Sequence, residues 1–260
     1  MTRRMRVILT TLLLFTTSLF GPALPAEAAS QPHWSTTTID GPDGAMAVES
    51  VTDASDKGSR PLVLLLSGTK GFFKPAYRTM AERFAAAGMD AYLVPYLSAR
   101  DLHEIARAGS APARIRYYAT RQARWIETVR KIATALNADP HHNGKIGVFG
   151  LSLGAQVASA VSANNQQFSA VVLVDGGFPE GYRTPVTSMP PLQLIWGEAD
   201  RAFPISGAKR LETQMKQLGG PVTLTTYPGM SHGFILAQDR PEAIKAWSVA
   251  AHFFQTSLSR

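Results

Sequence analysis

Short apolar runs alternate with longer amphipathic segments from Pro61 to the end of the chain, and this alternation constrains the fold most strongly. The run at 62–66 contains no polar residue, which is typical of a strand buried on both faces. The pattern predicts strands at 46–51, 62–66, 90–94, 146–149, 170–174, 192–196 and 222–227, and helices at 77–87, 111–136, 153–163, 206–218 and 241–255. We therefore expect a mostly parallel sheet with helices on both faces, in one domain of about 230 residues.

The first 28 residues have the three parts of an export signal. A segment with three arginines precedes an apolar stretch at 7–20, and small residues stand before a cleavage site after Ala28. An uncleaved anchor is the alternative, but a helix of this stretch spans only about 21 Å, less than the roughly 30 Å core of a bilayer. We expect a signal peptide at 1–28, a mature periplasmic or secreted domain at 29–260, and no stable membrane insertion after cleavage.

Composition excludes several classes of function. The chain has no cysteine, which removes disulfides, thiol nucleophiles and cysteine-based metal sites. Between Arg100 and Lys131, eight basic residues accompany only three acidic ones, which indicates a solvated helix face or, alternatively, contact with an anionic partner. Charge is the only sign of nucleic-acid binding, and His141 and His142 lack further ligands at metal-binding spacing. We expect no nucleic-acid partner, metal or cofactor, and nothing in the pattern indicates an oligomeric state.

A candidate nucleophile lies between the predicted strand at 146–149 and the next helix. The sequence there is Gly150-Leu-Ser152-Leu-Gly154, which matches G-x-S-x-G. This pattern puts a serine on a sharp strand-to-helix turn, where backbone N–H groups can stabilise a developing oxyanion. We predict that Ser152 is the nucleophile; a tight structural turn is the alternative.

A serine nucleophile needs a base, and the base needs an acid that orients it. Of the six histidines, only His232 lies in a small-residue loop directly after a predicted strand. Asp200 follows the strand at 192–196 with Gly-x-x-Asp spacing, and Glu198 is the less favoured alternative. The chain order Ser152, Asp200, His232 is that of the α/β-hydrolase fold.

The loop after the strand at 62–66 is the expected source of a second oxyanion donor. Its glycines permit close approach of the backbone, so we predict that the N–H groups of Thr69 and Leu153 form the oxyanion hole. The same loop also spells Ser67-Gly-Thr-Lys70, the S-x-x-K pattern of penicillin-recognising enzymes. That motif should open a helix and have K-T-G or S-D-N companions, and neither companion is present.

The chain resembles the dienelactone hydrolase family of α/β-hydrolases. The resemblance is carried by segments at 64–71, 94–100, 150–154, 197–200 and 229–234. It implies hydrolysis of carbonyl esters or lactones through an acyl-enzyme on Ser152. The namesake enzymes have a cysteine nucleophile, a glutamate where Gly68 stands, and a second arginine where Leu236 stands. These departures argue against dienelactone itself as the substrate.

The substrate and its contacts are less constrained than the triad. Arg100 matches a family arginine that helps to hold a substrate carboxylate, and Lys70 and Phe72 are further candidate substrate contacts. Other aromatic residues on the expected site loops, and residues 175–178, could line a pocket or belong to the core. We expect a small-molecule ester as substrate. A thioester or peptide substrate and a non-catalytic binding protein on a hydrolase fold are the alternatives.

Overall fold

The computed structural model describes residues 32–54 and 58–259, and the predicted signal peptide lies outside these ranges. Its eight strands are β1 (Pro32–Gly41), β2 (Gly44–Asp53), β3 (Arg60–Leu66), β4 (Asp90–Leu93), β5 (His142–Leu151), β6 (Ala170–Val174), β7 (Leu192–Gly197) and β8 (Val222–Tyr227). They form one sheet in the order β1-β2-β4-β3-β5-β6-β7-β8. The hairpin β1–β2 and the pair β2–β4 are antiparallel, and all other pairs are parallel.

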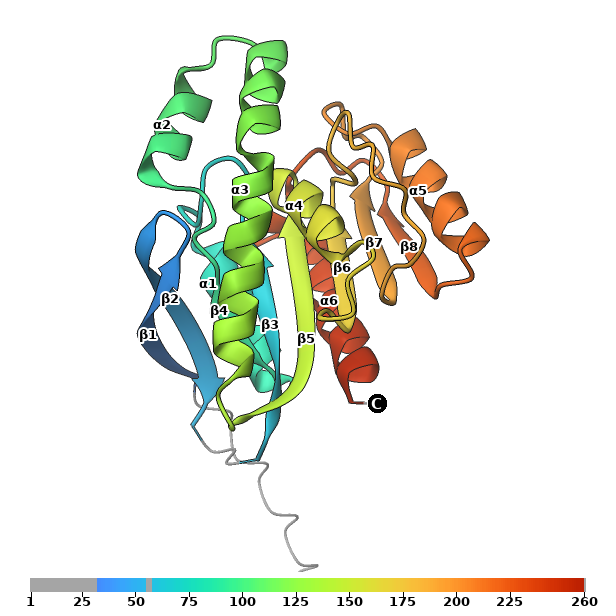
Figure 1. The fold of residues 1–260 in the computed structure, drawn as a ribbon. Coiled ribbons are helices and arrows are strands. Elements are labelled where there is room, and N and C mark those ends of the chain that lie inside the picture. The colour runs from blue at the N-terminus through green and yellow to red at the C-terminus, as the bar shows by residue number, and fades with distance from the viewer. Residues whose placement is uncertain (1–31, 55–57, 260) are drawn as a thin grey trace, which may run out of the picture.

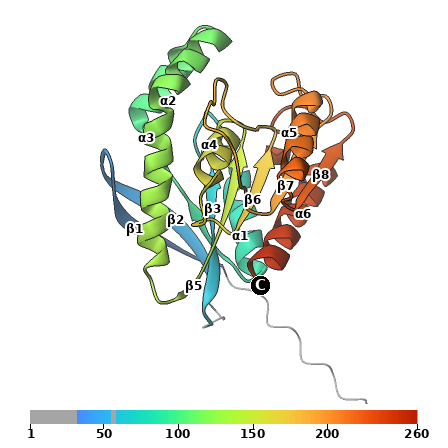
Figure 2. The same ribbon diagram turned by 45° about the vertical axis from the view of Figure 1, so that its right-hand side comes forward.

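Helices cover both faces of this sheet (Figures 1 and 2). They are α1 (Ala76–Ala86), α2 (Ala99–Arg107), α3 (Ala111–Asn137), α4 (Leu153–Ser162), α5 (Ile205–Gln217) and α6 (Pro241–Leu258), with a short 3-10 turn η1 (Phe234–Leu236). Helices α1 and α6 pack on one face, and α3, α4 and α5 pack on the other. The predicted fold class is confirmed: the described residues form a single domain with a mostly parallel sheet between two helical layers.

One strand, one α-helix and the short turn η1 were absent from the sequence prediction. Strand β1 contains almost no buried residue, so it lacks the alternation by which a half-buried strand is recognised. It forms because it pairs along its whole length with β2 at the edge of the sheet. Helix α2 is short and charged, but Ser98 and Asp101 form a capping box at its start, and this S-x-x-D spacing was a readable signal.

The sheet presents its carboxyl edge to one side of the molecule, where the loops after β3, β5, β6, β7 and β8 meet. Helix α2 and the first turns of α3 stand beyond this edge (Figure 1). Strands β3, β6 and β7 and the second half of β5 are mostly apolar and buried, which gives these loops a rigid base. Ligands of open α/β sheets bind at this edge, so the search for a site begins there. Within the described ranges, no helix combines the length and apolarity needed to span a bilayer.

Candidate active site

The turn between β5 and α4 projects Ser152 from the carboxyl edge of the sheet. Its φ of +56° and ψ of −116° lie in a region that residues with side chains rarely adopt. A Cβ at Gly150 would overlap the backbone of Gly154, and a Cβ at Gly154 would overlap the carbonyl of Leu66. The N–H of Ser152 donates to the carbonyl of Val174 at the end of β6, at 2.9 Å. Two glycines and a hydrogen bond to the neighbouring strand therefore hold the sharp turn.

Ser152, His232 and Asp200 form a hydrogen-bonded chain. Ser152 Oγ lies 2.9 Å from His232 Nε2, and His232 Nδ1 lies 2.8 Å from Asp200 Oδ2. The other oxygen of Asp200 accepts the N–H groups of Ala202 and Phe203, at 2.7 and 2.8 Å. The Asp200 side chain is fully buried, whereas that of His232 is 31% exposed. The buried Asp200 thus orients the imidazole, and the exposed part of the ring remains accessible to a ligand.

Glu198, the alternative acid, is exposed and accepts a hydrogen bond from Thr226 Oγ1 at 2.7 Å. The described structure has no hydrogen bond between Glu198 and His232. The alternative nucleophile Ser67 is buried at the end of the β3 segment, and α1 begins only at Ala76. The S-x-x-K motif of penicillin-recognising enzymes should begin a helix at its serine. In this structure Ser67 is followed by a loop instead.

The loop after β3 lies beside the Ser152 turn, so that a Cβ at Gly68 would stand 3.6 Å from Ser152 Cβ. The N–H of Gly68 donates to Tyr77 Oη at 2.9 Å, which ties the loop to α1. Thr69 follows in the same loop, and Leu153 is the first residue of α4, whose N–H has no intrahelical acceptor. Both residues line the cleft next to Ser152, and neither N–H donates to a group in the described part of the chain.

A cleft of about 1040 Å³ opens in front of Ser152 and His232. Apolar side chains from α2, α3 and the loops after β6 and β7 form much of its wall: Leu102, Ile105, Ile115, Tyr118, Phe178 and Phe203. Charged side chains also line it, namely Lys70, Arg114, Glu180 and Arg201. The cleft is therefore large, mainly apolar in its walls, and charged at a few points.

The three candidate substrate contacts occupy different environments. Lys70 lines the cleft. Arg100 is exposed on α2 and is not among the lining residues. Phe72 is also outside the lining, because its ring packs edge-on against Tyr77, with centroids 5.1 Å apart. Of the other aromatic candidates, Phe178 lines the cleft, whereas Tyr96 is buried.

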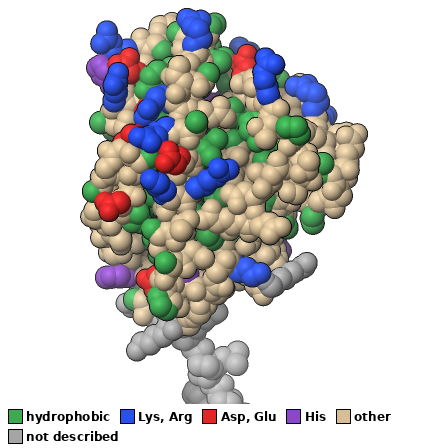
Figure 3. All heavy atoms as spheres, viewed as in Figure 1, with side chains coloured by type: hydrophobic (Ala, Val, Ile, Leu, Met, Phe, Trp, Pro, Cys, Tyr) green, Lys and Arg blue, Asp and Glu red, His purple; other side chains and the backbone are tan. Residues whose placement is uncertain are grey.

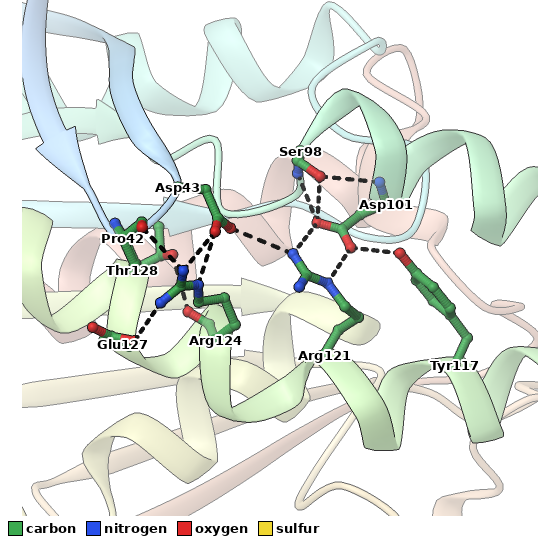
Figure 4. A network of polar contacts seen from close by, with 9 residues as sticks. All are labelled: Pro42, Asp43, Ser98, Asp101, Tyr117, Arg121, Arg124, Glu127 and Thr128. Atoms are coloured by element: carbon green, nitrogen blue, oxygen red, sulfur yellow. Dashed lines mark hydrogen bonds and ion pairs between the residues drawn. The ribbon is translucent and has the colours of Figure 1, made fainter.

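A polar network holds the α2 wall of the cleft in place (Figure 4). Asp101 is almost fully buried and accepts hydrogen bonds from Ser98, from Tyr117 Oη at 2.7 Å and from Arg121 Nε at 2.7 Å. Asp43, in the β1–β2 turn, accepts two hydrogen bonds from the guanidinium of Arg124, at 2.9 and 2.7 Å. Several arginines of the basic segment are thus paired within the fold.

The remaining basic residues of this segment belong to a mixed surface. Figure 3 shows lysine and arginine side chains, with acidic ones among them, over the region where α2 and α3 stand in Figure 1. Arg107, Arg116 and Arg130 are exposed, and Lys131 pairs with Glu127 at 3.5 Å. Much of the segment is therefore a solvated helix face with internal ion pairs.

Asp175, which the sequence analysis placed only in the possible pocket-lining stretch 175–178, lies beside the hydrogen-bonded chain of Ser152, His232 and Asp200. It follows β6 directly, is fully buried, and has a φ of +46°. One ligand atom each of Asp175, Asp200 and His232 lies within 4.8 Å of the others, which is a spacing that could hold a metal ion. The carboxylate oxygens there already accept N–H groups from the surrounding loops, including those of Gly197 and Gly233. The chemistry of the donor set thus fits a hydrogen-bonded cluster.

The fold and the site together define the class of protein. A mostly parallel eight-stranded sheet with a serine turn after β5, an aspartate after β7 and a histidine after β8 is an α/β-hydrolase. The model of the dienelactone hydrolase family matches residues 48–258. The chain belongs to this family and is a hydrolase that acts on ester bonds.

Several solved structures share this fold. A dienelactone hydrolase from Anabaena variabilis is 21% identical, with a TM-score of 0.67 over 88% of this chain and 99% of that one. A putative dienelactone hydrolase from Klebsiella pneumoniae is 15% identical, with a TM-score of 0.71 over 86% and 98%. Carboxyl esterase 2 from Tuber melanosporum is 15% identical, with a TM-score of 0.66 over 93% and 94%. No curated protein matches the sequence.

Proposed function

We propose that this protein is an exported serine hydrolase that cleaves carboxylic esters through an acyl-enzyme on Ser152. The observation that carries the proposal is the continuous chain from Ser152 Oγ to His232 and on to Asp200, with both contacts below 3 Å. A serine hydroxyl is a weak nucleophile, and an imidazole at hydrogen-bond distance can remove its proton during attack. The buried aspartate keeps the imidazole in the tautomer that accepts this proton.

Acylation follows directly from these roles. Ser152 Oγ attacks the ester carbonyl carbon while its proton moves to His232 Nε2, and the carbonyl oxygen becomes an oxyanion. When the tetrahedral intermediate collapses, the imidazolium returns the proton to the leaving alcohol, and the acyl group remains on Ser152. A water molecule activated by the same imidazole then attacks the acyl-enzyme and releases the acid.

The N–H groups of Thr69 and Leu153 are the proposed donors to the oxyanion. Both border the cleft beside Ser152 and have no acceptor in the described structure. Leu153 also stands at the N-terminus of α4, where the helix dipole favours negative charge. Removal of one such donor typically lowers kcat about 10²- to 10³-fold, because the donor stabilises negative charge that develops only in the transition state.

The cleft indicates esters with an apolar portion larger than acetyl. Leu102, Ile105 and Tyr118 form an apolar wall, and each buried methylene contributes about 0.8 kcal/mol. We therefore expect kcat/KM for p-nitrophenyl esters to rise with acyl length above acetate. Of the three candidate substrate contacts Arg100, Lys70 and Phe72, Lys70 borders the cleft. We propose that its ammonium group binds polar groups of the substrate.

The test uses residues 29–260 of wild type, Ser152→Ala and Ser67→Ala. Each protein is incubated with a fluorophosphonate probe and with p-nitrophenyl esters from acetate to decanoate. We expect Ser152→Ala to lose labelling and turnover together, by at least about 10³-fold, and Ser67→Ala to keep both. Equal labelling of wild type and Ser152→Ala would reject the proposed nucleophile. A folded wild type that neither labels nor turns over any ester would favour a binding protein.

Export is the second part of the proposal and rests on residues 1–28, whose composition is that of a signal peptide. Expression of the full chain in a bacterial host, followed by N-terminal sequencing of the protein released from the periplasm, tests it. We expect the mature chain to begin at Ala29. Recovery of the intact chain in the cytosolic fraction would contradict export.

A further inference from the structure

A single buried carboxylate, that of Asp175, joins the two loops that carry Asp200 and His232. Asp175 Oδ1 accepts the N–H of Gly197 at 2.9 Å, and Gly197 ends β7 where the Asp200 loop begins. Asp175 Oδ2 accepts the N–H of Gly233, directly after His232, at 2.8 Å. Each loop is therefore held by one oxygen of the same carboxylate.

The backbone around Asp175 completes the connection to the nucleophile turn. The carbonyl of Val174, one residue earlier, accepts the N–H of Ser152 at 2.9 Å, and the N–H of Asp175 donates to Ile195 at 3.1 Å. A φ of +46° is uncommon for a residue with a side chain, and such strain clusters at functional sites. Here this conformation accompanies a carboxylate aimed at the two loops.

We propose that Asp175 is a positioning residue of the triad, which fixes the Asp200 and His232 loops against the Ser152 turn by accepting one N–H from each loop. The inference rests on the proposed function and adds a fourth residue to it. Asp175 has no side-chain hydrogen bond to Ser152 in the described structure and is not among the residues that line the cleft, so it acts through the residues that it holds. Misplacement of a catalytic group by about 1 Å can lower the rate about 10²-fold. A residue that only positions the triad can therefore have a large effect on kcat.

The charge of Asp175 has a second effect. Burial raises the pKa of its carboxyl to about 6, although the N–H groups of Gly197 and Gly233 act in the opposite direction. The charged groups that act on it are Asp200, from the loop after β7, and His232, from the loop after β8. The ionised carboxylate favours the imidazolium that forms on His232 during attack. Below about pH 6 a proton on one oxygen would face an N–H group and weaken the contact.

Asp175→Asn is the sharpest test because it keeps the shape of the side chain. It removes the negative charge and puts an NH₂ group opposite one of the two N–H donors. With p-nitrophenyl butyrate, we expect kcat to fall about 10- to 100-fold while KM stays nearly unchanged. We also expect the acid limb of kcat/KM to move to lower pH, because the imidazole loses a neighbouring negative charge.

Glu198→Gln is the matched control, since it makes the same change on an exposed carboxylate in the loop after β7, one of the two loops that Asp175 contacts. It should leave kcat, KM and the pH profile as in the wild type. Titration with the fluorophosphonate probe gives the fraction of competent enzyme in each preparation. An Asp175→Asn protein with wild-type kcat and pH profile would overturn the inference. So would a protein whose lower activity is explained entirely by a smaller competent fraction.

Asp175→Ser provides a second variant, because its smaller hydroxyl can accept one N–H without a clash. It should show the same direction of change as Asp175→Asn. If both variants fail to fold while Glu198→Gln folds, Asp175 serves folding in general and the positioning role is rejected. A wild type without Ser152-dependent hydrolysis would instead reject the proposed function, so the two failures are distinguishable.

Discussion

At the scale of single residues, the least visible part of the site is the pair of backbone N–H groups at Thr69 and Leu153. No side chain reveals this role, because every residue except proline has the donor. The requirement is positional: one loop must pass beside Ser152 and one helix must begin there, and the structure has both. Substitution by proline is therefore the direct probe of the Thr69 donor.

Thr69→Pro is expected to lower kcat by about 10²- to 10³-fold, because it deletes the proposed oxyanion donor. Thr69→Ala removes the side chain and keeps the N–H, so its kcat should stay within about two-fold of the wild type. Steady-state hydrolysis of p-nitrophenyl butyrate, with circular dichroism as the check on folding, measures both. Equal kcat for a folded Thr69→Pro and the wild type would show that this N–H does not bind the oxyanion.

At the scale of elements, α2 is held by its polar contacts more than by its packing. Only two of its nine residues are buried, and one of these is Asp101. Burial opposes ionisation of Asp101, but hydrogen bonds from Arg121, Ser98 and Tyr117 outweigh it and hold the pKa of this carboxyl well below its usual range. The helix supplies Leu102 and Ile105 to the cleft wall, so the network that holds it also shapes the cleft.

Asp101→Asn should cost about 2 kcal/mol of unfolding free energy at pH 7, because a buried charge with several donors is lost. The depressed pKa means that this stability is present above about pH 4 and lost as pH falls towards the folded value. The cost should therefore shrink in acid, as urea denaturation at pH 7 and pH 3.5 would show. We also expect KM for p-nitrophenyl octanoate to rise more than KM for the acetate.

The matched control for Asp101 is Asp43→Asn, which alters an exposed carboxylate of the same network (Figure 4). Exposed ion pairs contribute little, so this variant should lose less stability and keep the chain-length preference. An equal loss of unfolding free energy in Asp101→Asn and Asp43→Asn would show that the contacts of Asp101 do not cause the loss.

At the scale of the whole molecule, the sheet has a second buried polar cluster at its opposite edge. Asp90 is fully buried among Arg60, His141 and His142, and Tyr92 Oη lies 2.9 Å from His142 Nε2. Burial lowers the pKa of His142 despite the nearby charge of Asp90. The folded state therefore keeps this histidine neutral at a pH where the unfolded chain binds a proton.

This cluster predicts acid sensitivity of the fold. The stability that neutral His142 contributes is present above about pH 6.5 and is lost as pH falls towards the folded pKa, at most about 1.4 kcal/mol per pH unit. His142→Gln should reduce the loss of unfolding free energy between pH 7 and pH 5.5, measured with urea. The exposed variant His252→Gln should not change it. A wild-type slope in His142→Gln would assign the acid loss to other groups.

Local patterns were sufficient for the layered fold and for the candidate triad. Strands β6 and β8 begin and end where the sequence pattern predicts, because β6 is a short buried apolar run and β8, at the edge of the sheet, alternates apolar and polar residues. The Ser152 turn, Asp200 and His232 are recognisable because each lies at a fixed place relative to a strand. The role of Asp175 could not be read in this way, since an aspartate after a strand also suits a turn or a helix cap.

The sequence by itself determined the alternation of elements, the order of Ser152, Asp200 and His232, and hence the class of fold. Tertiary structure decided what no local pattern contains: the edge pairing of β1, the α2 wall of the cleft and the double contact of Asp175 with Gly197 and Gly233. The physical reason is the distance along the chain over which each kind of interaction acts. Periodicity and turn chemistry act over a few residues, whereas a cleft and a shared carboxylate depend on distances between loops that are set only when the whole sheet is folded.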